Sequence, residues 1–175
     1  MGLDQRGFMQ KLFRKACFFL FIAASLLFVS PSFSNSSGLP LPRFVSLRSD
    51  EVNLRRGPGT QYRIDWVFVR ANLPVQIISE FETWRKVRDI EGAEGWVHQS
   101  MLSGKRTVMI PLFQDPVTLQ KHPDSKAHAV AYIQGGVIGR LKKCKKNWCL
   151  LIFQDHEGWL QKKDFWGLQE GEVIK

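Results

Sequence analysis

Apolar residues beyond position 35 fall into short runs, not into long helical stripes. The runs hold about four residues each and are rich in β-branched and aromatic side chains, as strands are: Trp66–Val69, Val75–Ile78, Val87–Ile90, Val130–Ile133 and Leu150–Phe153. Turn-forming residues separate them, at Gly57–Gly59, Asn72–Pro74, Glu91–Gly95 and Gly135–Gly136. No stretch of this region keeps a helical apolar period over three turns. The pattern predicts an all-β protein built from small barrels or sandwiches.

A different apolar pattern occupies residues 16–29, which read ACFFLFIAASLLFV. This run is shorter than the roughly 20 residues that a transmembrane helix needs, and it matches the apolar region of a signal peptide. Three basic residues precede it, as in a signal peptide: Lys11, Arg14 and Lys15. Ser32 and Ser34 place small residues at −3 and −1 of a cut after Ser34. We therefore predict a cleaved signal peptide over residues 1–34, with an uncleaved membrane anchor as the alternative.

The chain carries a formal net charge of +9. The predicted signal peptide holds four basic residues and one acidic residue, so a net charge of +6 belongs to the remainder. A basic surface attracts acidic glycans, anionic lipids or acidic proteins, but the same charge also keeps a small exported protein soluble. Export to the periplasm or out of the cell disfavours nucleic acid as a partner. Membrane contact is then expected only transiently, through the signal peptide.

The region after the signal peptide contains an internal repeat. The segment 52–58, VNLRRGP, is matched by 117–123, VTLQKHP. Each is followed at a similar distance by two tryptophans, of which the second comes directly after a glycine, as Trp84 and Gly95-Trp96 and then as Trp148 and Gly158-Trp159. Landmarks in register predict two similar units. We assign residues 35–44, which contain Leu39-Pro40-Leu41-Pro42, to an extended linker, 45–110 to the first unit and 111–175 to the second.

The first unit resembles the bacterial SH3 (SH3b) domains. The resemblance rests on the opening VNLRRGPGTQY at 52–62, on the WRKV of 84–87 and on the GWV of 95–97, and it covers residues 45–110. The second unit keeps Val117, Leu119, Pro123, Trp148, Gly158 and Trp159 but lacks the asparagine and both glycines of the opening motif. The resemblance implies two tandem SH3-like β-barrels, each five-stranded and strongly bent. It also implies an extracytoplasmic binding role, commonly towards peptidoglycan or envelope proteins.

Five residues of the first unit are the candidate ligand-binding groove: Arg55, Arg56, Tyr62, Trp84 and Trp96. The Gly57-Pro58-Gly59 turn would let a long loop fold back and present Arg55, Arg56 and Tyr62. The tryptophans would form an aromatic floor for a peptide or a sugar. The alternative is structural, because tryptophans repeated in both units are also what core packing produces. Trp166 has no aromatic counterpart, and either a surface contact or packing between the units would explain it.

Cys144 and Cys149 flank the tetrapeptide KKNW in a predicted hairpin. In an oxidising compartment, two cysteines left after removal of Cys17 with the signal peptide predict a disulfide. A Cys–His metal site is the alternative, but His156 alone gives it little support. The neighbouring basic run, Lys142–Lys146, is interpreted either as a solvated hairpin tip or as a contact for anionic material.

Residue patterns for catalysis are not evident. The two cysteines have no histidine close by in sequence, the histidines show no metal-type pairing, and nucleophile-elbow and phosphate-loop motifs are absent. We expect no catalytic residues, no cofactor and no metal. The sequence therefore predicts an exported non-catalytic binding module for peptidoglycan or an envelope protein. The alternatives are a secreted effector and an accessory subunit of a wall hydrolase acting in trans, and the oligomeric state stays open.

Overall fold

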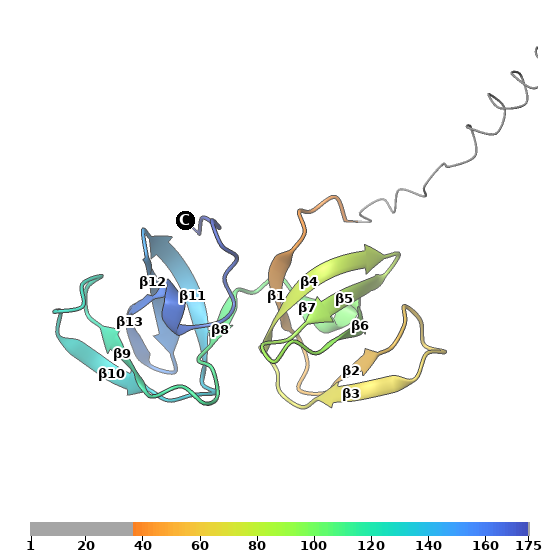
Figure 1. Ribbon diagram of the computed structural model, residues 1–175, viewed down its shortest axis with the longest axis horizontal. Helices are drawn as coiled ribbons and strands as arrows, with labels where there is room; N and C mark the ends of the chain where they lie inside the picture. Colours follow the sequence, from red (N-terminus) through yellow and green to blue (C-terminus); the bar gives the residue numbers. More distant parts are fainter. Residues whose placement is uncertain (1–36, 175) are drawn as a thin grey trace, which may run out of the picture. The chain divides into compact units, whose positions relative to one another are not determined.

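The computed structural model describes residues 37–174, and the predicted signal peptide lies outside these residues. These described residues belong to one compact unit. The described part consists of β-strands, turns and two short 3₁₀ helices, η2 (Gln99–Met101) and η3 (Lys162–Asp164), and it contains no α-helix. The strands form two sheets, which Figure 1 shows as two groups of arrows. The all-β prediction is confirmed.

Seven strands make the first sheet: β1 (Arg43–Leu47), β2 (Val52–Arg55), β3 (Ile64–Phe68), β4 (Pro74–Phe81), β5 (Trp84–Arg88), β6 (Glu94–His98) and β7 (Leu102–Ser103). They lie in the order β3-β2-β6-β5-β4-β1-β7, and neighbouring strands are antiparallel. Alternate residues of β5 and β6 are buried, so each strand turns one face inward. The fully buried side chains at the centre of this core include Leu54, Val75, Val87 and Val97.

Six strands make the second sheet: β8 (Thr107–Met109), β9 (Val117–Gln120), β10 (Ala129–Ile133), β11 (Ile138–Lys145), β12 (Trp148–Phe153) and β13 (His156–Gln161). Their order is β10-β9-β13-β12-β11-β8. The core of this sheet includes Leu119, Leu151, Phe153 and Leu160. The sheets hold seven and six strands where the resemblance implies five. One reason is that β3, which follows the loop after β2, pairs back with β2 as an additional strand.

The loop between β2 and β3 and the loop between β9 and β10 have the same pattern of backbone hydrogen bonds. In the first repeat these bonds run from Arg56 N to Arg63 O, from Gly59 N to Gly57 O and from Tyr62 N to Gly59 O. In the second repeat they run from Lys121 N to His128 O, from Asp124 N to His122 O and from Ala127 N to Asp124 O. The loop geometry therefore survives the loss of both glycines of the opening motif.

Strand pairing places two segments differently from the sequence prediction. Residues 108–110 were expected at the end of the first unit, but β8 pairs with β11 of the second sheet. Ile110, just after β8, exchanges backbone hydrogen bonds with Gly136 and Val137, as Leu47 does with Asn72 and Leu73. Thus β8 is the structural counterpart of β1, and a strand that opens the second sheet was predicted to close the first unit. The division of the chain into domains at residue 110 stays a prediction.

The other difference concerns the predicted linker, residues 35–44. In its described part, Ser37 donates through its amide and its hydroxyl to the two carboxylate oxygens of Glu80, both at 2.9 Å. Leu41 packs against the first core, and β1 already begins at Arg43. This segment is docked on the first sheet because its apolar and polar side chains both find partners there.

Two glycines permit the close approach that joins the strands of each sheet. A Cβ atom on Gly95 of β6 would lie 2.5 Å from the Leu54 side chain and 2.9 Å from the Arg55 carbonyl oxygen. A Cβ on Gly158 of β13 would meet Leu119 at 2.6 Å and the Gln120 carbonyl oxygen at 2.8 Å. These contacts include backbone atoms, which cannot rotate away. The repeated Gly-Trp dipeptide therefore has a packing reason.

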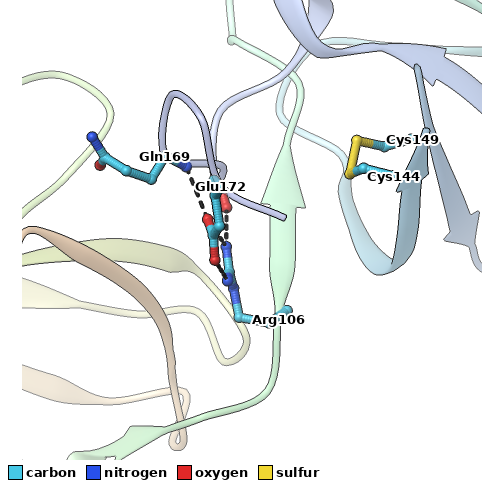
Figure 2. Close-up of a disulfide and its surroundings, with 6 residues drawn as sticks. Arg106, Cys144, Cys149, Gln169 and Glu172 are labelled. Carbon is cyan, nitrogen blue, oxygen red and sulfur yellow. Dashed lines mark hydrogen bonds and ion pairs between the residues drawn. A yellow bond between two sulfur atoms is a disulfide. The ribbon is translucent and has the colours of Figure 1, made fainter. Parts of the chain in front are cut away.

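The hairpins β4–β5 and β11–β12 are linked across their strands by different chemistry at the same register position. Cys144 pairs with Cys149 and the two form a disulfide, which confirms the predicted bond (Figure 2). The matching pair in the first sheet is Glu80 and Arg85, joined by an ion pair at 3.1 Å and both more than nine-tenths buried. Glu80 also accepts a hydrogen bond from Arg43. Burial raises the pKa of Glu80, but the hydrogen bonds from Arg43 and Ser37 outweigh it, so this pKa lies below its usual value.

The C-terminal segment is fastened to the start of the second sheet. Figure 2 shows that the carboxylate of Glu172 accepts hydrogen bonds from the guanidinium of Arg106 and from the backbone N–H of Gln169. Arg106 also donates to the carbonyl of Gly167 at 2.9 Å. Burial raises the pKa of Glu172, yet the hydrogen bonds from Arg106 and Gln169 hold it below its usual value. Ile174 packs against the second core, whereas Val173 before it is exposed.

We expect Gly158→Ala to lower the free energy of unfolding by about 1–3 kcal/mol, as overpacking does. The reason is that the new methyl group would press on the backbone of β9. Chemical unfolding followed by circular dichroism measures the effect. Gly104→Ala is the matched control, because a Cβ there meets nothing within 4 Å. Equal destabilisation by both changes would contradict the packing argument.

Reduction of the Cys144–Cys149 disulfide should lower the free energy of unfolding by on the order of 2 kcal/mol, since the bond closes only a short loop. A melting curve with and without reductant measures the change. The double variant Cys144→Ser/Cys149→Ser should melt like the reduced protein and should not respond to reductant. A melting temperature that ignores reductant in the unmodified protein would count against a stabilising role.

Acid should remove the stabilisation supplied by Glu80. Its native pKa lies below the ordinary 4.5, so the unfolded chain binds this proton more readily and stability falls as the pH drops below about 4.5. Glu80→Gln should cost roughly 3 kcal/mol at pH 7, because Arg85 is left buried without its carboxylate. The gap between variant and unmodified protein should narrow towards pH 3 in urea unfolding. A gap that is constant with pH would refute the assignment.

Candidate binding surface

The outer face of the first sheet carries a row of three side chains across β2, β6 and β5. Trp96 lies opposite Arg55 on one side and opposite Lys86 on the other. Residues directly opposite in neighbouring strands share a face of the sheet. The flanking Gly95 and Val97 are buried, so Trp96 and its two partners point outward. The row therefore presents an indole ring between two cations.

Trp84 belongs to the same outer face. It lies opposite His98, two positions along the strand pair from Trp96 and Lys86. The rings of Trp84 and His98 stand edge to face, with centroids 5.4 Å apart. Trp84 also faces Phe81 of β4, which is 39% exposed. The structure thus brings Arg55, Trp84 and Trp96 to one surface, and both tryptophans are half-buried there.

The long loop after β2 is tied to this surface by Arg55. Its Nη1 donates to the carbonyl oxygens of Thr60 at 3.0 Å and Tyr62 at 2.8 Å. The Tyr62 ring lies over Gly57, where a Cβ would come within 2.4 Å of the ring. Gly57 is therefore required by the tyrosine, and Tyr62 stays 42% exposed beside the loop.

Arg56 does not join Arg55. Its Nε donates to the carboxylate of Asp65 in β3 at 2.8 Å, and Arg63 also approaches this carboxylate. The hydrogen bond from Arg56 lowers the pKa of Asp65. Arg56 is thus paired with the edge strand β3 and does not belong to the group formed by Arg55, Trp84 and Trp96.

One carboxylate, that of Glu94, offsets part of the positive charge of the outer face. Glu94 accepts from Lys86 at 2.7 Å and from Arg88 at 2.6 Å. Hydrogen bonds from these two residues keep the pKa of Glu94 below its usual value, so it is ionised at neutral pH. Arg55 is instead bonded only to carbonyl groups in the contacts above, and its positive charge is retained on the surface.

The second sheet repeats the row with different side chains. Trp159 lies opposite Gln120 on β9 and opposite Leu150 on β12. Trp148 takes the place of Trp84, with Gln161 opposite it where His98 stands in the first sheet. The scaffold is the same, but neutral residues replace both cations and the histidine.

Sequence reasoning missed two residues of the first repeat. Lys86 completes the outer row, and its place two positions after Trp84 in a strand was the available signal. Trp66 on the edge strand β3 is 59% exposed, whereas the candidate tryptophans Trp84 and Trp96 are half-buried. It has Ala131 at the corresponding position, so the repeat pattern could not draw attention to it.

Trp166 proves to be a packing residue. It forms an isolated antiparallel bridge with Met109, in the way that Ser103 pairs with Ser46. Its ring stands edge-on to that of Phe44 in β1, with centroids 4.9 Å apart. Of the two explanations left open by the sequence, packing between the repeats is the one that the structure supports. The four lysines of the basic run are exposed, three at the end of β11 and Lys146 in the turn after it.

Residues 37–174 show neither a metal-type cluster nor a membrane-spanning helix. This part of the chain brings together no three His, Cys, Asp or Glu residues that could hold a metal ion. It also contains no helix with the length and apolar character needed to cross a bilayer.

Comparison with known proteins gives the following matches. The family model of the bacterial SH3 domain matches residues 48–104 and 114–167. NlpC2 from Trichomonas vaginalis is similar in structure, with a TM-score of 0.34 and 11% identity over 77% of this chain and 51% of that one. NlpC1 from the same organism has a TM-score of 0.33 and 13% identity over 75% and 48% of the two chains. The chain thus spans about half the length of these proteins. No curated protein matches it.

Proposed function

Because this chain belongs to the bacterial SH3 domain family, we propose that it is an exported, non-catalytic binding protein that recognises peptidoglycan in the periplasm or outside the cell. An envelope protein is the alternative partner. One observation carries the proposal: the outer row Arg55–Trp96–Lys86, in which two cations flank an aromatic ring. Peptidoglycan offers the complementary groups, namely the carboxylates of its peptide stems and the apolar faces of its sugar rings.

The contrast between the repeats supports this choice of surface. Trp159 packs between the neutral residues Gln120 and Leu150, so packing of this tryptophan does not require charged neighbours. Only the first repeat combines the indole with Arg55 and Lys86. A cation beside a half-buried aromatic ring is a common anchor in recognition surfaces, since it contributes both contact area and charge.

The state of the potential nucleophiles supports a non-catalytic role. Cys144 and Cys149 share a disulfide, so neither offers a thiolate. Ser100 contacts His98 at 2.7 Å, but this contact belongs to the cap of η2, where the Ser100 amide also donates to the same imidazole nitrogen. The other side of that ring meets Trp84, whereas a catalytic histidine is usually oriented by a carboxylate.

Co-sedimentation with purified peptidoglycan tests the proposal. The full-length chain is expressed, and the exported product is mixed with peptidoglycan at low and at moderate salt. We expect binding that persists at moderate salt, because the indole contact is not screened. Lys86→Gln and Trp96→Leu should each weaken binding about fivefold or more, which corresponds to about 1 kcal/mol.

Lys142→Gln is the charge-matched control, since it removes one exposed cation of β11, in the second sheet. It should leave binding unchanged. Equal losses in Lys86→Gln and Lys142→Gln, or binding that disappears at moderate salt, would mean that net charge alone attracts the polymer. Release of soluble wall fragments by the purified protein would overturn the non-catalytic assignment.

A further inference from the structure

A cleft of about 390 Å³ lies where the first sheet meets the second. Arg70 and Asn72 line it from the turn before β4, and Lys105 lines it from the segment that connects β7 to β8. The second sheet contributes Arg140 of β11 and Gln154 of the turn between β12 and β13. The volume lies within the 300–1,000 Å³ that is typical of small-molecule sites. Because both sheets supply the walls, neither sheet alone contains this cleft.

Direct hydrogen bonds hold the walls of the cleft together. Nη1 of Arg70 donates to the carbonyl oxygen of Gly136, in the turn before β11, at 2.7 Å. The hydroxyl of Thr107 in β8 donates to the carbonyl oxygen of Asn72 at 2.8 Å. Both bonds cross from one sheet to the other, so the lining residues are positioned before a ligand arrives. A site with preset walls loses less entropy on binding.

Three cations line the cleft, and none of them is paired with a carboxylate among residues 37–174. Arg70 is bonded to a carbonyl oxygen, and Nζ of Lys105 donates to Oδ1 of Asn72 at 2.9 Å. The exposed side chain of Arg140 makes no hydrogen bond or ion pair with any residue in this part of the chain. No Asp or Glu residue of the described chain lines the cleft. Like charges that are brought together repel one another, and an anion bound among them removes this cost.

The lining also supplies hydrogen-bond donors. The contact with Lys105 fixes the orientation of the Asn72 amide, since its oxygen accepts from the ammonium group. The N–H₂ group of Asn72 is then left as a donor. Arg140 keeps all the N–H donors of its guanidinium, and Lys105 keeps those that Asn72 does not use. A lining of cations and N–H donors is suited to the oxygen atoms of an oxyanion.

The number of cations distinguishes between the common oxyanions. A carboxylate brings one negative charge and two oxygen atoms, so two of the three cations would stay unmatched. A phosphate monoester brings close to two negative charges at neutral pH and three terminal oxygen atoms. Guanidinium groups bind such oxygens in pairs. Ile138 and Ile152, both half-buried, line the cleft beside the cations and offer an apolar contact to the group that carries the phosphate.

We propose that the cleft between the two sheets binds a phosphate monoester group carried by a larger molecule, with Arg70, Lys105 and Arg140 around its terminal oxygens. Asn72 adds an uncharged N–H donor. The site shares no residue with the outer row Arg55–Trp96–Lys86, and it does not rest on the function proposed for that row. A soluble phosphate ester and a lipid headgroup present the same chemistry, and the experiments below separate these two sources.

Calorimetric titration of the exported full-length product with glycerol 3-phosphate tests the proposal. The titration is run at low salt and about pH 7.5, where the ester is largely dianionic because its second pKa is about 6. We expect saturable binding, and Arg140→Gln should weaken it at least tenfold. Lys142→Gln is the matched control, because it removes an exposed cation from the same strand but outside the cleft. It should leave the affinity unchanged.

Acetate serves as the carboxylate probe in the same titration and should bind at least tenfold more weakly than glycerol 3-phosphate. The proposal would be overturned by unchanged affinity in Arg140→Gln, by equal losses in Arg140→Gln and Lys142→Gln, or by acetate that binds as tightly as the phosphate ester. Lys86→Gln should bind glycerol 3-phosphate normally. A failure here is therefore distinguishable from a failure of peptidoglycan binding at the outer row.

Stability separates a ligand-binding role of Arg140 from a structural one. Without ligand, Arg140→Gln removes one of three neighbouring positive charges and no hydrogen bond, so its melting temperature at low salt should equal or exceed that of the unmodified protein. Glycerol 3-phosphate should raise the melting temperature of the unmodified protein, since it binds only the folded state, and should not raise that of the variant. A lower melting temperature of the ligand-free variant would overturn the proposal.

Vesicles distinguish a lipid headgroup from a soluble ester. Phosphatidic acid, mixed into phosphatidylcholine vesicles, presents a phosphate monoester, whereas phosphatidylglycerol presents a diester with a single charge. Sedimentation with the phosphatidic acid vesicles that is lost in Arg140→Gln would identify a lipid headgroup as the source. Binding of glycerol 3-phosphate without vesicle binding would identify a soluble ester. Equal binding to both kinds of anionic vesicle, unaffected by Arg140→Gln, would mean that net charge alone attracts the protein and would overturn the assignment.

Discussion

The close crossing of two strands at a glycine is the contact on which the rest of each sheet depends. At Gly95 and at Gly158 the chain approaches the backbone of the opposite strand so closely that a methyl group would collide with a carbonyl oxygen. This crossing joins the loop-bearing strand β2 or β9 to the meander of the same repeat. It also sets the following tryptophan opposite Arg55 or Gln120, so the candidate surfaces exist only because this contact is possible.

On this shared frame, the two repeats have diverged at matching positions. The hairpin next to the core is tied by the buried Glu80–Arg85 ion pair in one repeat and by a disulfide in the other. An ion pair depends on pH and a disulfide on redox conditions, so the same position responds to different surroundings. On the outer face, Arg55 fills its own loop with an internal contact, while the neutral Gln120 borders an open groove. The repeats therefore offer surfaces of different charge.

Much of the fold followed from local patterns. Each of the five short β-branched runs falls on a strand to within three residues, namely β3, β4, β5, β10 and β12, since alternation and turn residues act over neighbouring positions. The strand predicted at residues 87–90 is β5, and it ends two residues earlier, at Arg88, because Asp89 accepts hydrogen bonds from the backbone amides of Glu91 and Ala93 in a turn. The strand β1 was missed and β8 was assigned to the first unit, since their partners lie about 30 residues away in β4 and β11. Of the candidate site residues, Arg55, Trp84 and Trp96 share one face, but Arg56 is engaged elsewhere and Lys86 was overlooked.

The sequence by itself determined the all-β class, the tandem repeat, the family resemblance and the disulfide, because each rests on residue types at fixed spacing. Only the tertiary structure decided which side chains share a face, that Gly57 makes room for Tyr62, and that Oε1 of Gln120 has no hydrogen-bond partner within the described chain. These features depend on distances between residues remote in sequence. The sequence gives the neighbours of a residue along the chain but not the side chains that surround it in space.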